Sequence, residues 1–215
     1  MVSTSDLAGG VGELGLALEP AQLEQLVRYS DLLVRWNRVH NLTAVEPGQT
    51  LTHHLLDSLS IVPTLTTRAH GKAPLRVLDV GAGGGLPGIP LAIALPAAHV
   101  TLLDKVEKKV AFLRQVQLEL RLPNVDVVHA RVEQLRAPPF DVILARAFAT
   151  LLQLVKLSRT LLANDGCWCA MKGMLPRAEI DELERAQLGV RIAQIVKLHV
   201  PRLDAERHLI LIEPS

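Results

Sequence analysis

A glycine-rich segment that directly follows a run of strand-forming residues constrains the fold of this chain more than any other feature. Residues 75–80 read Leu-Arg-Val-Leu-Asp-Val, residues 81–85 contain four glycines, and a helical pattern of apolar residues begins at Pro87. The apolar run is typical of a buried strand, and glycine lets the backbone come close to a ligand because it lacks a Cβ atom. A strand, a glycine turn and a helix in this order predict a doubly wound α/β domain that binds a small molecule at the carboxyl edge of its sheet.

Strand and helix patterns alternate from this loop to the end of the chain. The further strands are expected at residues 100–103, 125–128, 141–145, 166–171, 191–198 and 208–212, with helices at 87–95, 106–120, 151–162 and 178–187. Such alternation favours right-handed crossovers and a mostly parallel sheet, here of seven strands. Residues 201–207 join the last two strands without a helix, so one of those strands is expected to be antiparallel.

The first 70 residues follow a different pattern, and we interpret them as a helical extension packed on an α/β domain of residues 71–215. One helix is predicted from Pro20, with an apolar stripe that runs from Leu23 to Val34. A second helix is predicted around residues 55–62 and is expected to end at Pro63. Residues 1–18 contain four glycines, which disfavour an ordered element there.

Composition excludes several classes of protein. Hydrophobic residues make up 49% of the chain and charged residues 21%, a balance typical of a globular domain and not of a disordered one. The apolar runs are shorter than the ~20 residues that cross a bilayer. Cys167 and Cys169 stand too close along one predicted strand for an ordinary disulfide, which fits a reducing compartment. We therefore expect a cytoplasmic protein without a membrane segment, and we expect a monomer because nothing suggests an obligate dimer.

A formal net charge of +1 gives no overall attraction to nucleic acid, so any contact with RNA must come from local basic clusters. The candidates are Arg28, Arg35 and Arg38 on the first long helix, and Lys105, Lys108, Lys109 and Arg114 after the second strand. Each cluster is equally compatible with an ordinary solvated helix face.

The glycine loop and two acids favour S-adenosylmethionine over a dinucleotide. Residues 83–88 contain a formal GxGxxG fingerprint, so a nicotinamide-dependent dehydrogenase is an alternative. That fingerprint starts three residues beyond the strand, and Pro87 removes an N–H group that a pyrophosphate would need. S-adenosylmethionine has no phosphate, and its ammonium group suits a carboxylate such as Asp79. Asp104 ends the second strand, where an acid can accept hydrogen bonds from ribose hydroxyls. The residues expected around the cofactor are Asp79, Gly81, Gly83 and Asp104.

The end of the fourth strand, residues 141–149, indicates which atom receives the methyl group. Methylation of an exocyclic amine usually requires an Asn or Asp beside a proline, and methylation of a pyrimidine carbon requires a nucleophilic cysteine. The strand end has neither. Guanine N7 carries an in-plane lone pair and no proton, so its methylation requires alignment but no general base. Arg146 is a candidate for contacting a phosphate, the acceptor base or the cofactor, with an ordinary pairing to an acid as the alternative.

Other polar residues near the expected site have two open interpretations. Lys172, directly beyond the fifth strand, is a candidate for contacting substrate phosphate or else a solvated strand end. Cys167 and Cys169 fit core positions better than a nucleophilic role. His53 and Asp57 lie one turn apart on the second helix but supply too few ligands for a metal site, so no metal is expected. The first interpretation of His53 and Asp57 is an ordinary polar helix face, and the second is contact with the substrate.

Several motifs together resemble the glucose-inhibited division protein B family, the bacterial 16S ribosomal RNA guanine-N7 methyltransferases. The matching segments are Trp36-Asn37, Asn41-Leu42-Thr43, residues 54–59, residues 79–90, Leu102-Leu103-Asp104, Lys108-Lys109, Phe112-Leu113, Arg131-Val132-Glu133, residues 146–149, Lys172-Gly173 and Arg207-His208-Leu209. Many members have Phe where this chain has Leu86, and Gly-Arg-Ala-Glu where it has residues 130–133. Both changes keep apolar side chains around the expected position of the cofactor's adenine ring.

The resemblance implies a class I, Rossmann-like S-adenosylmethionine methyltransferase fold, with residues 71–215 as the methyltransferase domain. It implies one guanine in the 530 loop of 16S rRNA, in the 30S ribosomal subunit, as the acceptor. The resemblance also implies that the residues that contact the cofactor in this family correspond to Gly81, Leu86, Val132, Glu133 and Arg146. Arg146 and Lys172 are the candidate catalytic residues, and the candidate RNA contacts are Arg35, Arg38, Asn37, Asn41, Lys105 and Lys109. The alternatives left open are another RNA base or a small molecule as acceptor, and a non-catalytic RNA-binding protein that retains the fold.

Overall fold

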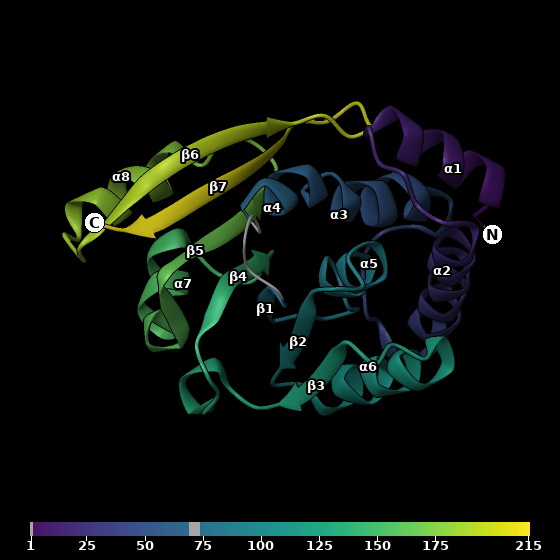
Figure 1. Ribbon diagram of the computed structural model, residues 1–215, viewed down its shortest axis with the longest axis horizontal. Coiled ribbons are helices and arrows are strands. Elements are labelled where there is room, and N and C mark those ends of the chain that lie inside the picture. The colour runs from purple at the N-terminus through teal and green to yellow at the C-terminus, as the bar shows by residue number, and fades with distance from the viewer. Residues whose placement is uncertain (1, 69–73) are drawn as a thin grey trace.

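The computed structural model describes residues 2–68 and 74–215, which form one seven-stranded sheet covered by helices on both faces (Figure 1). The strands are β1 (Arg76–Val80), β2 (His99–Asp104), β3 (Val125–His129), β4 (Phe140–Arg146), β5 (Leu162–Lys172), β6 (Val190–Leu198) and β7 (Arg207–Pro214). Their order is β3-β2-β1-β4-β5-β7-β6. The order in which strands are added reverses at β1, since β2 and β3 lie on one side of it and β4 and β5 on the other. Open sheets bind ligands at such a switch point.

The expected α/β architecture is confirmed, including one antiparallel strand at the end of the chain. Strands β1 to β5 pair in parallel, whereas β7 runs antiparallel to both β5 and β6. The helices of this part are α5 (Gly88–Ala94), α6 (Glu107–Leu120), α7 (Leu151–Ser158) and α8 (Arg177–Arg185), with 3₁₀ turns η3 (Val132–Gln134) and η4 (Arg159–Leu161). The helix expected over 151–162 therefore ends earlier than predicted, and β5 begins at Leu162.

Successive residues of a strand point to opposite faces of the sheet, and each face has its own hydrophobic core. Val77 packs with the residues of α2, α5 and α6, whereas its neighbour Leu78 packs with those of α7 and α8. Figure 1 shows α7 and α8 on the opposite side of the sheet from α5 and α6. Cys167 and Cys169 form no disulfide, and both are buried in the first core, as expected for packing residues.

The N-terminal extension consists of α1 (Thr4–Glu13), α2 (Pro20–His40), the 3₁₀ turn η1 (Pro47–Gln49), the π-helical turn η2 (Leu51–Leu56), α3 (Asp57–Leu59) and α4 (Val62–Arg68). The expectation that residues 1–18 lack order is wrong. A Cβ atom on Gly10 would stand 2.6 Å from Leu56 Cδ1, so this glycine allows α1 to pack closely on η2. The expected helix end at Pro63 is also wrong, because Pro63 lies in the first turn of α4, where its missing N–H costs nothing.

Helix α2 joins the extension to the sheet domain through polar contacts as well as apolar ones. The side chains of Gln22 and Gln25 donate to the carbonyls of Ile93 and Leu120 at 2.6 and 2.9 Å, which satisfies acceptors at the ends of α5 and α6. The predicted boundary between residues 70 and 71 lies outside the described residues.

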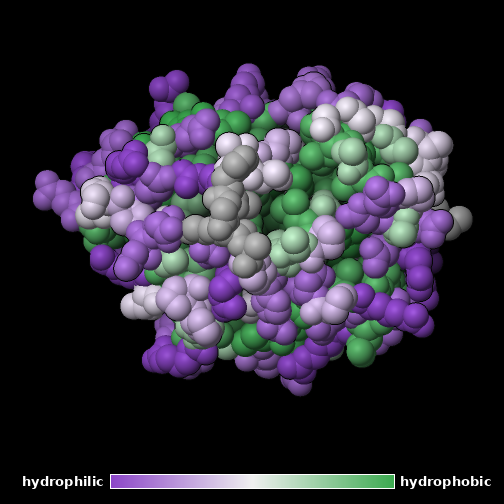
Figure 2. Space-filling view, in the orientation of Figure 1, coloured by the Kyte–Doolittle hydropathy of each residue, from purple (hydrophilic) through white to green (hydrophobic). Residues whose placement is uncertain are grey.

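The face of the molecule in Figure 2 is mostly hydrophilic, and hydrophobic residues gather near its middle, over α3 and α5. Among the described residues, the large exposed hydrophobic side chains are Val39, Leu118, Met174 and Ile195, each from a different part of the fold. Single side chains of this kind are normal on protein surfaces. No helix within the described ranges is both long and apolar enough to span a membrane.

Candidate functional site

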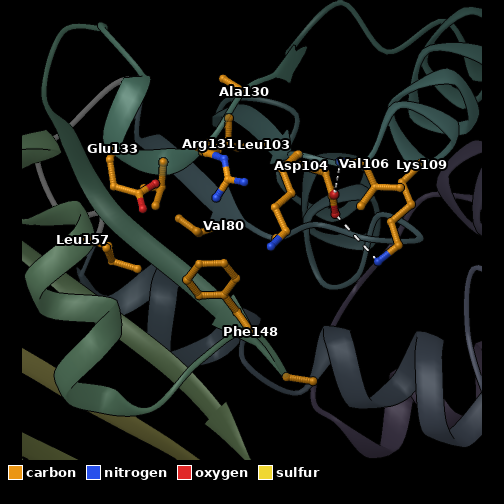
Figure 3. A pocket seen from close by; sticks show the side chains of 14 residues that line it. Val80, Leu103, Asp104, Val106, Lys109, Ala130, Arg131, Glu133, Phe148 and Leu157 are labelled. Carbon is orange, nitrogen blue, oxygen red and sulfur yellow. Dashed lines mark hydrogen bonds and ion pairs between the residues drawn. The ribbon is translucent and has the colours of Figure 1, made fainter.

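A cavity of about 290 Å³ opens at the carboxyl ends of β1 and β2 (Figure 3). We call it the donor cavity. It is lined by Val80, Gly81, Leu103, Asp104, Lys105, Val106, Lys109, Ala130, Arg131, Val132, Glu133, Ala147, Phe148 and Leu157. Four of the predicted cofactor residues, Gly81, Asp104, Val132 and Glu133, thus meet in one place, and the lining combines apolar side chains with five charged ones.

Asp104 is the buried acid of the donor cavity. Its Oδ2 accepts from the Gly83 N–H at 2.9 Å, and its Oδ1 accepts from the Val106 N–H at 2.8 Å. Lys109 Nζ lies 4.0 Å from Oδ2. A carboxylate offers about four lone-pair sites, so Asp104 retains acceptor capacity toward a ligand while it fixes both the glycine loop and the start of α6.

The glycine loop is shaped for close contact with an aromatic ring. Gly81 has φ +72°, and a Cβ atom on it would stand 2.5 Å from Phe148 Cδ2. Figure 3 shows the Phe148 ring inside the cavity, beside Val80. Ala147, which precedes the ring, has φ 52°, a left-handed conformation that is uncommon for a residue with a Cβ atom. The loop after β4 therefore places an aromatic ring in the donor cavity, against the glycine loop.

Val132 and Glu133 also line the donor cavity. They belong to the short turn η3, and Val132 is buried whereas Glu133 is exposed. The preceding Ala130 N–H donates to the Asp104 carbonyl at 3.2 Å, which ties this segment to the end of β2. Figure 3 shows Glu133 across the cavity from Asp104.

Four predicted cofactor contacts, Asp79, Gly83, Leu86 and Arg146, do not line the donor cavity. Asp79 has no exposed surface. Its Oδ2 accepts from the Gly88 N–H at 2.9 Å, and its Oδ1 has no hydrogen-bond partner among the described residues. Burial raises the pKa of Asp79 to about 7. Sequence reasoning could not see that the acid lies beneath the loop and caps α5 instead of facing the opening.

A second cavity, of about 430 Å³, lies between the extension and the sheet domain. We call it the acceptor cavity. The extension supplies Thr43, Ala44, Val45, His53, His54 and Asp57, and the sheet domain supplies Arg146, Ala147, Met171, Lys172, Gly173, Leu198, Arg207 and His208. Ala147 lines both cavities, so they adjoin at the carboxyl end of β4.

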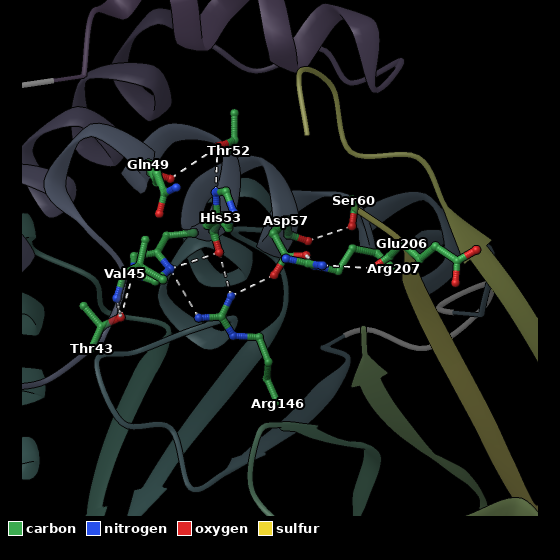
Figure 4. Close-up of polar contacts among 11 residues, drawn as sticks. Thr43, Val45, Gln49, Thr52, His53, Asp57, Ser60, Arg146, Glu206 and Arg207 are labelled. Carbon is green, nitrogen blue, oxygen red and sulfur yellow. Dashed lines mark hydrogen bonds and ion pairs between the residues drawn. The ribbon is translucent and has the colours of Figure 1, made fainter. Parts of the chain in front are cut away.

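Arg146 is held by the extension (Figure 4). Its Nη1 donates to Asp57 Oδ2 at 2.8 Å and to the His53 carbonyl at 3.1 Å. Asp57 Oδ1 accepts from Arg207 Nε at 2.9 Å. The predicted alternative of an arginine paired to an acid is thus the observed arrangement, but the acid is buried and comes from the extension. Sequence reasoning missed this role of Asp57 and the part of Arg207, although both stood in the family motifs.

Two histidines of the acceptor cavity are fixed by hydrogen bonds. His54 Nε2 lies 2.9 Å from Thr43 Oγ1, and burial, together with the charge of Arg146, lowers the pKa of His54 to about 4. His54 is therefore neutral at pH 7. His208 Nδ1 lies 2.7 Å from the Gly173 carbonyl, so that nitrogen carries the proton and donates it.

Lys172 lines the acceptor cavity, but its ammonium group is engaged. It donates to both carboxylate oxygens of Glu179, at 2.8 and 3.0 Å, and to the Ala149 carbonyl at 3.1 Å. Glu179 also accepts from the Leu151 N–H at 2.8 Å. Lys172 is thus not a solvated strand end, and it fixes the loop after β4 against α8.

The predicted RNA contacts fall in two places, on α2 and its end and around the donor cavity. Arg35 and Arg38 line a hollow on α2, and Lys105 and Lys109 line the donor cavity. Asn37 accepts from the Thr43 N–H at 2.8 Å and shapes the chain after α2, and the exposed Asn41 ends that helix with φ 49°. Within the described ranges, no three His, Cys, Asp or Glu side chains are grouped as a metal site.

Comparisons with known proteins agree with this geometry. The family model described as "GidB: rRNA small subunit methyltransferase G" matches residues 22–210. A relative from Leptothrix cholodnii, named ribosomal RNA small subunit methyltransferase G, is 51% identical and covers 97% of this chain and 94% of its own. One of the same name from Chromobacterium violaceum is 49% identical and covers 96% of each.

Solved structures show the same fold at low identity. The glycopeptide N-methyltransferase MtfA, complexed with sinefungin, has a TM-score of 0.62 at 13% identity and covers 76% of this chain and 95% of its own. The match over residues 22–210 and the identity over nearly whole chains are decisive for the family. The chain therefore belongs to the GidB family, the family of rRNA small subunit methyltransferase G.

Proposed function

We propose that this protein transfers a methyl group from S-adenosylmethionine to N7 of one guanine in the 530 loop of 16S rRNA. The observation that carries the proposal is the meeting of two cavities at Ala147. A donor in one cavity and a base in the other face each other across the end of β4. In-line transfer requires this proximity, and alignment of the reactants supplies much of the rate.

The donor cavity and the glycine loop beside it fit the cofactor. Asp104 accepts hydrogen bonds from the ribose, and the apolar Val132 with Glu133 lies beside the adenine. Gly81 and Gly83 let the methionine chain lie against the backbone. The bound cofactor supplies a methyl group activated by a sulfonium. Asp79 contributes through the loop that it holds, and Leu86 through the packing beneath that loop.

One contact disfavours the dinucleotide alternative. A pyrophosphate binds to free N–H groups at the first turn of the helix after the glycine loop. Here the Gly88 N–H at that turn donates to the buried carboxylate of Asp79. A phosphate at this point would lose that donor and meet a carboxylate, whereas a cofactor without phosphate is unaffected.

The acceptor cavity favours a ring nitrogen over an exocyclic amine. Among the described residues that line it, Asp57 is the single acid, and two arginines occupy its oxygens. His54 is neutral and tied to Thr43. The cavity therefore offers hydrogen-bond donors and few acceptors, which suits the O6 of guanine and RNA phosphates. N7 needs no base because it carries no proton.

The remaining features follow from this assignment. The substrate partner is 16S rRNA in the small subunit, and the enzyme acts in the bacterial cytoplasm as a monomer. Arg146 orients the acceptor from the end of β4, and Lys172 positions the loop that carries Ala147. The basic residues Arg35, Arg38, Lys105 and Lys109, with Asn37 and Asn41 at the end of α2, contribute to contact with RNA.

Transfer of labelled methyl from S-adenosylmethionine tests the proposal. The acceptors are 30S subunits that lack the modification, deproteinised 16S rRNA and 50S subunits as control. We expect label in 30S subunits and none in 50S subunits. Cofactor binding without transfer to any RNA would favour the non-catalytic alternative, and transfer to a small molecule or to another base would favour the other alternative.

A further inference from the structure

The buried carboxylate of Asp57 connects three elements around the acceptor cavity. It lies at the start of α3 in the extension, its side chain is 4% exposed, and it accepts from Arg146 at the end of β4 and Arg207 at the start of β7. The partners stand 89 and 150 positions away in the sequence. Figure 4 shows the two guanidinium groups approaching Asp57 from different sides.

The charges of this cluster do not cancel. Two guanidinium groups and one carboxylate leave a net charge of +1 beside the cavity. Asp57 brings the two cations together, since like charges in a partly buried site repel each other strongly. If the carboxylate were removed, Arg146 would keep the His53 carbonyl and Arg207 would keep the Glu206 carbonyl, but nothing would hold the two side chains together.

Both arginines keep donors for a ligand. Arg146 donates through its Nη1 and Nη2 groups, and Arg207 through Nε and Nη1. Neither the Nε–H of Arg146 nor the Nη2 group of Arg207 donates to any of the described residues. Both side chains line the acceptor cavity, so these free groups can meet an oxygen atom of the acceptor nucleotide.

We propose that Asp57 is a positioning residue for methyl transfer. It acts through Arg146 and Arg207, whose free N–H groups it aims at the acceptor nucleotide, and it therefore makes the extension a part of the acceptor site. This inference rests on the proposed function. It does not involve the donor cavity, because Asp57 does not line it.

The test compares Asp57→Asn and Asp57→Glu with wild type in methyl transfer to 30S subunits. We expect Asp57→Asn to lower kcat by ~30-fold, since breaking a buried charge pair is costly. The dissociation constant for S-adenosylmethionine should stay within ~2-fold of wild type, since the donor cavity is intact. Asp57→Glu should recover part of kcat. The matched control is Glu206→Gln, an exposed acid next to Arg207 that pairs with Lys197 at 3.6 Å, and it should behave as wild type.

A double-mutant cycle separates positioning from a general loss of structure. If Asp57 acts through both arginines, Asp57→Asn should lower kcat less in a chain that already carries Arg207→Gln than in wild type, because only the contact with Arg146 is left to lose. Additive losses, or equal losses of cofactor affinity and kcat, would overturn the inference. If Asp57→Asn fails to fold, Arg207→Gln alone must still lower kcat with cofactor affinity unchanged, and a wild-type kcat there would refute the proposal.

The same experiment distinguishes this inference from the proposed function. Wild-type enzyme that transfers no methyl to 30S subunits contradicts the proposed function. If wild-type enzyme transfers methyl and the Asp57→Asn variant has the same kcat, only the role of Asp57 is contradicted.

Discussion

Replacing Asp104 by alanine removes the acceptor that we assign to the cofactor ribose. The carboxylate also accepts from the N–H groups of Gly83 and Val106, so the change affects both ligand binding and the loop itself. Two effects are therefore expected, and their sizes can be estimated separately.

The loss in cofactor affinity follows from the hydrogen bonds to the ribose. A hydrogen bond to a charged group contributes ~1.5–3 kcal/mol. Loss of one or two such bonds, about 3 kcal/mol, corresponds to ~100-fold weaker binding. The loss in stability comes from the two N–H groups left without a partner. At ~1 kcal/mol or more for each, Asp104→Ala should lower Tm by ~4–8 °C in a chain of this length.

Calorimetry with S-adenosylmethionine and thermal unfolding measure the two effects. Asp126→Ala is the matched control, because this acid lies on the neighbouring strand β3, is 62% exposed and pairs with His99. It should leave cofactor affinity unchanged. Asp104→Asn keeps one acceptor oxygen and should bind more tightly than Asp104→Ala. An Asp104→Ala variant that binds the cofactor like wild type would refute the assignment of the ribose site.

Three further predictions concern the loop and the buried titrating groups. Gly81→Ala should weaken cofactor binding by ~10-fold or more, since its Cβ atom would force Phe148 to move and would be strained at φ +72°; calorimetry that shows wild-type affinity would refute this. Because burial raises the pKa of Asp79 from 3.8 to about 7, its contribution to stability is fully present below pH 3.8 and is lost as pH rises through 7. Urea unfolding should therefore show wild type losing stability relative to Asp79→Asn between pH 4 and 7, and parallel curves would contradict it. The pKa of His54 is lowered from 6.5 to about 4, so its contribution is present above pH 6.5 and is lost as pH falls through 4. A His54→Gln variant should lose less stability than wild type over that interval, and an equal loss would show that His54 titrates normally.

The sequence predicted the sheet domain well because its signals are local. Strand runs, glycine turns and helical stripes each depend on a few neighbouring residues, and the alternation of strands with helices predicts a mostly parallel sheet. The sequence did not predict helix α1, because its glycines lower the helix propensity of this segment. In the structure Gly10 has a packing role, since a side chain there would collide with Leu56. Only the tertiary contact reveals that role.

The polar residues of the site were predicted less completely, because their partners are distant in the sequence. Asp57 stood on a polar helix face, and its arginines lie on β4 and β7. Lys172 was identified as important, but its partner Glu179 lies on the next helix. Such pairings depend on how the elements pack, and one sequence does not show them.

The position of the methyl group in the RNA tests the central claim most directly. Sodium borohydride followed by aniline cleaves RNA at N7-methylguanosine, and primer extension locates the break. After treatment of unmethylated 30S subunits with the enzyme and S-adenosylmethionine, the account predicts one new break, at a guanine of the 530 loop. No break despite methyl transfer, or a break elsewhere in 16S rRNA, would contradict it.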